Sequence, residues 1–202
     1  MTTAMERTWS CKCGQVQAKL SGEPKLLIRC YCRSCVAACK FMDEKNKQSG
    51  ISMLDSTGGA CACPYSTSQV EFITSLSDLN GNSKIRFVRV GEKGPAYRCY
   101  TTCCGTAMLN ALMMGIIVFN RNAIKNADGS PFEVPEENIL NINKKHAFDQ
   151  ASVPDPSYDT APFLARLTFI GAILNPFAKK LNLKELVPDT SLDEVVPITW
   201  EN

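Results

Sequence analysis

The feature that most constrains this chain is a run of three cysteines, Cys30, Cys32 and Cys35, within six positions. An apolar side chain would fill a core without the risk of oxidation, so three thiols this close together indicate a metal site. In an extended segment, residues i and i+2 point to the same side, which lets Cys30 and Cys32 face one ion. A turn after Cys32 would then return Cys35 to that ion. Three buried free cysteines are the alternative interpretation.

Thiolate sulfur is a good ligand for zinc, which takes it at about 2.3 Å and keeps a fourth position open when the site is catalytic. Cys30, Cys32 and Cys35 are therefore the candidate catalytic zinc ligands. Cys39 follows Cys35 by one helical turn and could supply a fourth sulfur. A fourth protein ligand would close the site and exclude catalysis, and the sequence leaves both possibilities open.

A second group of cysteines predicts another zinc site. Cys11 and Cys13 repeat the i, i+2 spacing and need two partners from a distant segment. Cys103 and Cys104 are the first choice, because a turn can direct adjacent side chains to one ion, and Cys99 is the reserve. Four thiolates would make a closed site of the structural kind, which contributes folding free energy directly.

The overall composition narrows the functional classes. Eleven cysteines among 202 residues, behind an N-terminus with no apolar signal segment, indicate metal ligation in a reducing, cytoplasmic compartment. No stretch reaches the ~18 apolar residues of a membrane-spanning helix. A net charge of +2 argues against a nucleic-acid binder with a broad basic face. The single histidine, His146, is expected to be structural or exposed, and Cys61 and Cys63 are expected to be small residues of a strand.

Short alternating segments separated by turn residues predict a mainly β fold of short antiparallel strands. Residues 1–9 are expected to form a loose leader, and residues 36–42 a short helix after the central cysteines. The expected strands lie at 16–20, 25–31, 69–74, 84–90, 96–100 and 115–120.

The sequence pattern changes near residue 125, from short strand-like segments to turn-rich and helical ones, which predicts that the chain has two structural parts. Residues 1–125 would form the zinc-binding β domain, and residues 126–202 a C-terminal extension whose end, after 188, is an extended acidic tail. Apolar residues at three- and four-residue steps predict an amphipathic helix near 160–181, kinked or ended at Pro176. We expect its apolar face to pack on the β domain, with a membrane surface or a partner protein as the alternative.

Several of these motifs together resemble the glutathione-dependent formaldehyde-activating enzymes and their centromere-protein-V-like relatives. The resemblance implies a β-tent zinc-knuckle domain with a structural zinc at the Cys11/Cys13 pair and the late cysteines. It also implies a catalytic zinc at the Cys30–Cys35 run and a carbon–sulfur lyase acting on a glutathione adduct of formaldehyde. The matching elements cover roughly residues 10–120 in the family's order: Cys11-x-Cys13-Gly14-x-Val16, Leu20-x-Gly22-x-Pro24, Cys30-Tyr31-Cys32-x-x-Cys35 and Cys104-Gly105-Thr106.

The chain departs from the family's pattern at the late cysteines. The family usually shows Cys-x-x-Cys-Gly there, and Thr101 stands where the first of those cysteines is expected. The structural zinc can survive this change if Cys103 takes over as a ligand. The departure indicates a divergent branch, in which the metal can be kept while the substrate changes.

Three functional hypotheses remain. In the first, an open zinc site activates the sulfur of a small thiol adduct such as S-hydroxymethylglutathione, with Arg33 and Arg98 as candidates for holding its carboxylates. In the second, the chain is a non-catalytic zinc module whose helix near 160–181 binds a protein partner. In the third, it is a thiol redox or metal-storage protein. The role of Cys39 distinguishes the first hypothesis from the second.

Overall fold

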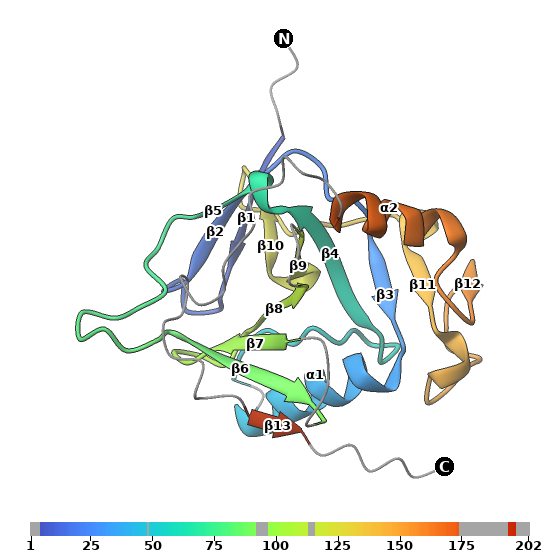
Figure 1. Cartoon of the computed structure of the whole chain (residues 1–202), viewed down its shortest axis with the longest axis horizontal. Helices are drawn as coiled ribbons and strands as arrows, with labels where there is room; N and C mark the ends of the chain where they lie inside the picture. The colour runs from blue at the N-terminus through green and yellow to red at the C-terminus, as the bar shows by residue number, and fades with distance from the viewer. Residues whose placement is uncertain (1–4, 48, 92–96, 113–115, 174–193, 197–202) are drawn as a thin grey trace.

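Two β-sheets form the body of the protein (Figure 1). The computed structural model describes residues 5–47, 49–91, 97–112, 116–173 and 194–196. Within these residues, the smaller sheet is antiparallel and has the strand order β10-β1-β2-β5. Its strands are β1 (Glu6–Ser10), β2 (Gln17–Ser21), β5 (Val70–Phe72) and β10 (Ile124–Asn126).

The larger sheet has the strand order β12-β11-β3-β4-β9-β8-β7-β6-β13. Neighbours from β3 to β6 are antiparallel, and the parallel pairs lie at the two edges. The prediction of a mainly β fold with short antiparallel strands is therefore confirmed. The strands are β3 (Ile28–Cys30), β4 (Ala60–Ser66), β6 (Ile85–Val90), β7 (Tyr97–Thr101), β8 (Ala107–Leu112), β9 (Ile116–Asn120), β11 (Leu140–Ile142), β12 (Ser157–Tyr158) and β13 (Glu194–Val196).

The helices are few and short. The α-helices of the described residues are α1 (Arg33–Lys45) and α2 (Phe163–Ile173). Helix α1 is longer than the predicted 36–42, because the side chain of Cys32 caps its first turn. Single turns of 3₁₀ helix connect several strands, namely η1 (Thr67–Gln69), η2 (Arg121–Ala123), η3 (Glu136–Asn138) and η4 (Lys144–His146).

The larger sheet is covered on both faces. One face packs against the smaller sheet, where Trp9 contacts Phe119 with ring centroids 5.9 Å apart. The opposite face packs against α1 through Ala38, Cys39 and Met42. Burial on both faces explains why every residue of β4 and β9 is buried, in contrast to the alternation expected for a sheet with one wet face.

The expectation of a loose leader at residues 1–9 is wrong from Glu6 onward. Strand β1 pairs with both β2 and β10 and so lies inside the smaller sheet. Trp9 is 0% exposed, and Arg7, 4% exposed, makes an ion pair with Glu23 at 3.0 Å. The strand is hard to find from sequence because Trp9 is its single large apolar residue.

The described part of residues 126–202 is joined to the larger sheet. Strand β11 pairs in parallel with β3, and β12 pairs with β11. Of the acidic tail predicted after residue 188, the structure describes Glu194–Val196, which pairs with β6 as β13. The rest of that tail, and residues 174–181 of the predicted helix, lie outside the described residues.

A C-terminal helix is present, but four of its large apolar side chains are exposed rather than packed on the β domain. Phe163, Leu164, Leu167 and Ile170 of α2 are between 44% and 76% exposed, and Ala165 is the buried residue at 5%. The packing expected for those four residues is therefore wrong. No helix among the described residues is long and apolar enough to cross a bilayer.

Replacing Trp9 with alanine is expected to lower the free energy of unfolding by about 3–5 kcal/mol, because it would open a large cavity between the two sheets. Urea unfolding followed by circular dichroism measures this change. Thr8→Ala, in the same strand at a half-buried position, is the matched control and is expected to cost less than about 1 kcal/mol. Equal effects of the two substitutions would contradict the core position of Trp9.

Candidate metal centres

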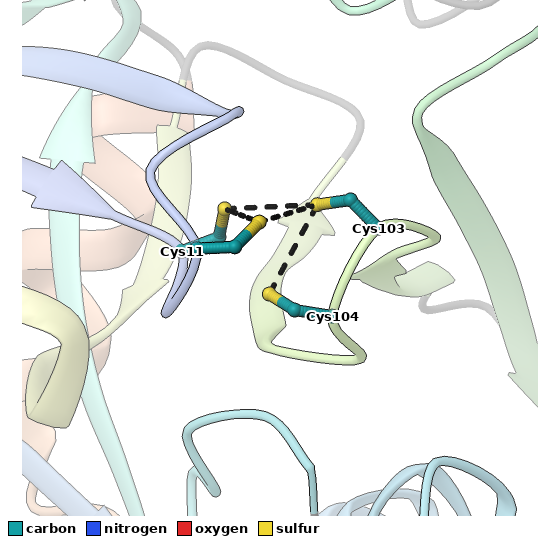
Figure 2. Close-up of side chains that lie close together, drawn as sticks. Cys11, Cys103 and Cys104 are labelled. Carbon is teal, nitrogen blue, oxygen red and sulfur yellow. Dashed lines mark hydrogen bonds between the residues drawn. The ribbon is translucent and has the colours of Figure 1, made fainter.

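The first cysteine cluster joins two turns that belong to different sheets. Cys11 and Cys13 lie between β1 and β2, and Cys103 and Cys104 lie between β7 and β8 (Figure 2). The sulfur atoms of these four residues all lie within 4.8 Å of one another. The structure thus brings together the predicted group, with Cys103 rather than Cys99 as a member.

The sulfur–sulfur distances fit one tetrahedral metal ion. A Zn–S bond of about 2.3 Å places the sulfurs of a tetrahedral site about 3.8 Å apart. Cys103 Sγ lies 3.7 Å from Cys11 Sγ, 3.2 Å from Cys13 Sγ and 3.9 Å from Cys104 Sγ, and Cys11 Sγ lies 3.6 Å from Cys13 Sγ. The four thiols therefore form a donor set that a single ion would use completely.

Both turns are held by contacts that leave the cysteines little freedom. The backbone N–H of Lys12, between the first two cysteines, donates to the hydroxyl of Thr106 at 3.0 Å and so ties one turn to the other. Gly105 follows Cys104 with a φ of +72°, a conformation that favours glycine. A Cβ at Gly105 would also clash with the side chain of Asn46. Substitution at Gly105 would therefore displace the second turn.

Two threonine hydroxyl groups lower the pKa of the Cys104 thiol in the first cluster. Burial raises the pKa of the Cys104 thiol, but hydrogen bonds with the hydroxyls of Thr101 at 3.5 Å and Thr106 at 3.2 Å outweigh burial and lower that pKa to about 6. Burial raises the pKa of Cys11 and of Cys103. Because the thiolate is the form that binds metal, Cys104 is the thiol best prepared to accept an ion.

The second cluster forms where β3 leads into α1. Cys30 ends β3, Cys32 is the N-cap of α1 and Cys35 lies in its first turn, and their sulfur atoms lie within 4.8 Å of one another. The backbone N–H of Cys35 donates to Cys32 Sγ at 3.4 Å, so the capping bond directs the Cys32 side chain toward the helix. The turn expected after Cys32 is the first turn of this helix.

Two polar side chains from distant strands contact the second cluster. Arg98 of β7, only 5% exposed, donates through Nη2 to Ser34 Oγ at 2.8 Å and to Cys35 Sγ at 3.8 Å. Asn143 follows β11 with a φ of +63°, and its Nδ2 donates to Cys30 Sγ at 3.4 Å. Both side chains are donors, which is the kind of group that stabilises thiolates.

The pKa values of the thiols in the second cluster are shifted in opposite directions. Hydrogen bonds with Cys30 and Cys32, together with the charge of Arg98, hold the pKa of the Cys35 thiol well below its ordinary value. Hydrogen bonds with Cys32 and Cys35 raise the pKa of Cys30 well above its ordinary value. The thiol with the lowered pKa is thus the one beside the guanidinium of Arg98.

The other cysteines belong to neither cluster. Cys39 of α1, 2% exposed, faces the core and is not among the thiols that converge with Cys35. Cys61, Cys63 and Cys99 are 0% exposed in β4 and β7. The structure describes all eleven cysteines, so no further thiol of this chain completes the second cluster.

Some residues near the clusters have positions and contacts that the sequence does not predict. Arg98, expected to hold a substrate carboxylate, is buried against Ser34 and Cys35, and Arg33 is exposed. Asn143 carries no sequence signal, because it is 113 positions from its partner Cys30. These contacts depend on strand pairing that brings distant segments together.

A comparison of the chain with protein-family models finds no match, and a comparison with curated proteins finds none either. Thiolate donors suit Zn²⁺, Cu⁺ and iron–sulfur clusters rather than Mg²⁺ or Ca²⁺. Both cysteine groups could hold such a metal, the first with four sulfurs and the second with three.

Replacing Cys103 with serine is expected to remove one bound metal ion per chain and to lower the thermal unfolding temperature, because the ion would join the two sheets. Elemental analysis of protein purified with zinc, together with thermal unfolding, measures both effects. Cys99→Ser is the matched control, since Cys99 is buried outside the cluster, and it should retain its metal. Unchanged metal content in the Cys103→Ser protein would rule out the four-sulfur site.

Proposed function

We propose that the protein binds two zinc ions, a structural one at the first cluster and a catalytic one at Cys30, Cys32 and Cys35. One observation carries this proposal. Three thiols converge at the second cluster, and no fourth Cys, His, Asp or Glu of the described residues joins them within 4.8 Å. Three protein ligands with an open position are typical of catalytic zinc sites, whereas four cysteines are typical of structural ones.

The proposed reaction breaks or forms the carbon–sulfur bond of a thiol adduct such as S-hydroxymethylglutathione. In the breaking direction, the bonding pair stays on sulfur, the hydroxyl loses its proton as formaldehyde forms, and the thiol takes up that proton. When bound, zinc would supply a Lewis acid that stabilises negative charge on sulfur. The choice of substrate rests on the resemblance of roughly residues 10–120 to the glutathione-dependent formaldehyde-activating enzymes.

Arg98 fits the role of a charge-balancing residue in this scheme. Three thiolates and one Zn²⁺ together carry one net negative charge, and a buried net charge is costly unless a partner lies close to it. The guanidinium of Arg98 is buried and contacts Cys35 Sγ, so it supplies the compensating charge. Asn143 would orient Cys30 through its hydrogen bond, as groups around metal ligands commonly do.

The departure from the family's pattern at the late cysteines is compatible with this proposal. Thr101 stands where the family has a cysteine, and its hydroxyl contacts Cys104 Sγ at 3.5 Å rather than supplying a ligand. Cys103 instead lies 3.2 Å from Cys13 Sγ. The first cluster thus reaches four sulfurs by a different route, which supports retention of the structural zinc.

A non-catalytic zinc module that binds a protein partner is the second candidate function. The observation that favours it is the exposure of large apolar residues along α2, with Phe163 at 72% and Leu164 at 76%. Exposed apolar rows on helices are a common means of recognising other proteins. A protein of this kind would bind zinc at the second cluster but would have no lyase activity. Cys32→Ser would then lose a zinc ion without any loss of activity.

Cys32→Ser is expected to remove one of two zinc ions and to abolish exchange between S-hydroxymethylglutathione and its components, because two sulfurs hold zinc poorly. Elemental analysis measures the zinc, and NMR exchange spectroscopy measures the reaction. Cys39→Ser is the control that should retain both zinc ions and the activity. Unchanged zinc in the Cys32→Ser protein would refute the site. Inactivity of the parent protein with two zinc ions bound would refute the enzyme and favour the binding module.

Arg98→Gln is expected to weaken zinc binding at the second cluster by about 10- to 100-fold and to leave the first cluster unchanged, since it removes the compensating charge. Competition with a chromophoric chelator measures both affinities. Arg33→Gln removes the same charge from an exposed neighbour and should change zinc affinity less than about twofold. Equal effects of the two variants would contradict the role assigned to Arg98.

A further inference from the structure

An open pocket of about 330 Å³ lies beside the N-terminal half of α1, and no cysteine lines it. Its basic lining residues are Arg33 and Lys40 of α1 and His146 of η4. Arg33 and Lys40 are seven positions apart, which places them on the same face of the helix. The pocket therefore brings together basic groups from two segments that are more than a hundred residues apart in the sequence.

The charge of this pocket is not neutralised by its surroundings. None of its lining residues is acidic. Among the described residues, the side chains of Arg33, Lys40 and His146 make no hydrogen bond or ion pair. Two full positive charges and an imidazole thus face the same opening without an anion. Unpaired charges gathered in a concave site attract ligands of opposite sign.

The rest of the lining is apolar and partly rigid. Val36 and Ala37 form the helix side, and Phe148 is fully exposed at the rim. Tyr31 is fixed by a hydrogen bond of 2.7 Å between its hydroxyl group and that of Thr57. A ligand that suits this pocket combines an anionic group with an apolar or aromatic part of modest size.

We propose that this pocket binds a small organic phosphate monoester, with the phosphate at Arg33, Lys40 and His146 and the organic group against Phe148. A phosphate monoester carries about −1.5 to −2 charges at pH 7, which matches the two full cationic charges better than a single carboxylate does. Guanidinium and ammonium groups are the usual partners of phosphate oxygens. The proposal needs no metal and stands independently of the function proposed for the cysteines.

Isothermal titration of the zinc-loaded protein with phenyl phosphate tests the proposal. We expect saturable binding that Lys40→Gln weakens about tenfold or more, because the variant loses a charge-assisted hydrogen bond. His146→Gln is expected to weaken it by a smaller factor. Lys125→Gln, which removes the same charge from an exposed position of β10, is the control and should change the affinity less than twofold. Benzoate is expected to bind at least several-fold more weakly than phenyl phosphate.

Three results would overturn the assignment. The first is no measurable binding of phenyl phosphate at millimolar concentration, and the second is equal affinity for benzoate, which would remove the preference for phosphate. The third is loss of binding in Cys35→Ser with full binding in Lys40→Gln, because that pattern would place the ligand on a metal ion. Normal phenyl phosphate binding in Cys35→Ser would instead support the pocket, whatever the activity of the cysteine site proves to be.

Discussion

Four sulfur atoms, of Cys11, Cys13, Cys103 and Cys104, converge where a turn of the smaller sheet meets a turn of the larger one. Apolar packing, as between Trp9 and Phe119, favours contact between the sheets but is non-directional. A metal ion held by thiolates has defined bond lengths and angles, so it would fix the position of one sheet on the other. The hydrogen bond from Lys12 to Thr106 joins the same two turns without metal. Packing and ligation therefore have different roles in the same interface.

The register of β7 connects the first cluster to the second. Successive residues of a strand point to opposite faces, so Cys99 enters the core between the sheets while Arg98 points toward α1 and contacts Cys35. Strand β7 runs directly into the turn that carries Cys103 and Cys104. A shift by one residue would exchange the two faces and place a guanidinium among apolar side chains. One strand therefore carries Arg98 to the second cluster and leads into the turn of the first cluster.

The cysteine groups are predictable because their spacing is local information. A Cys-x-Cys pair or a cysteine doublet already determines which sulfurs can face one ion, whatever the rest of the fold does. Asn143 is not predictable in this way, since it reaches Cys30 through the parallel pairing of β11 with β3. The packing of α2 also escaped prediction, because periodicity identifies an apolar face but not what covers it. Contacts between residues close in sequence could be predicted from their spacing, whereas contacts that depend on strand pairing could not.

The difference between a closed and an open cluster follows from the backbone that carries each. Two turns can each direct two neighbouring cysteines to one point, which yields four ligands. A strand that enters a helix yields three, because Cys39 lies a rise of about 6 Å beyond Cys35 and packs beside Met42. A fourth ligand for the second cluster must therefore come from outside the chain's cysteines. Asn143, from the segment after β11, lies beyond position 126 and donates a hydrogen bond to Cys30 Sγ. Asn143 is therefore a residue through which the C-terminal part of the chain can influence the second cluster.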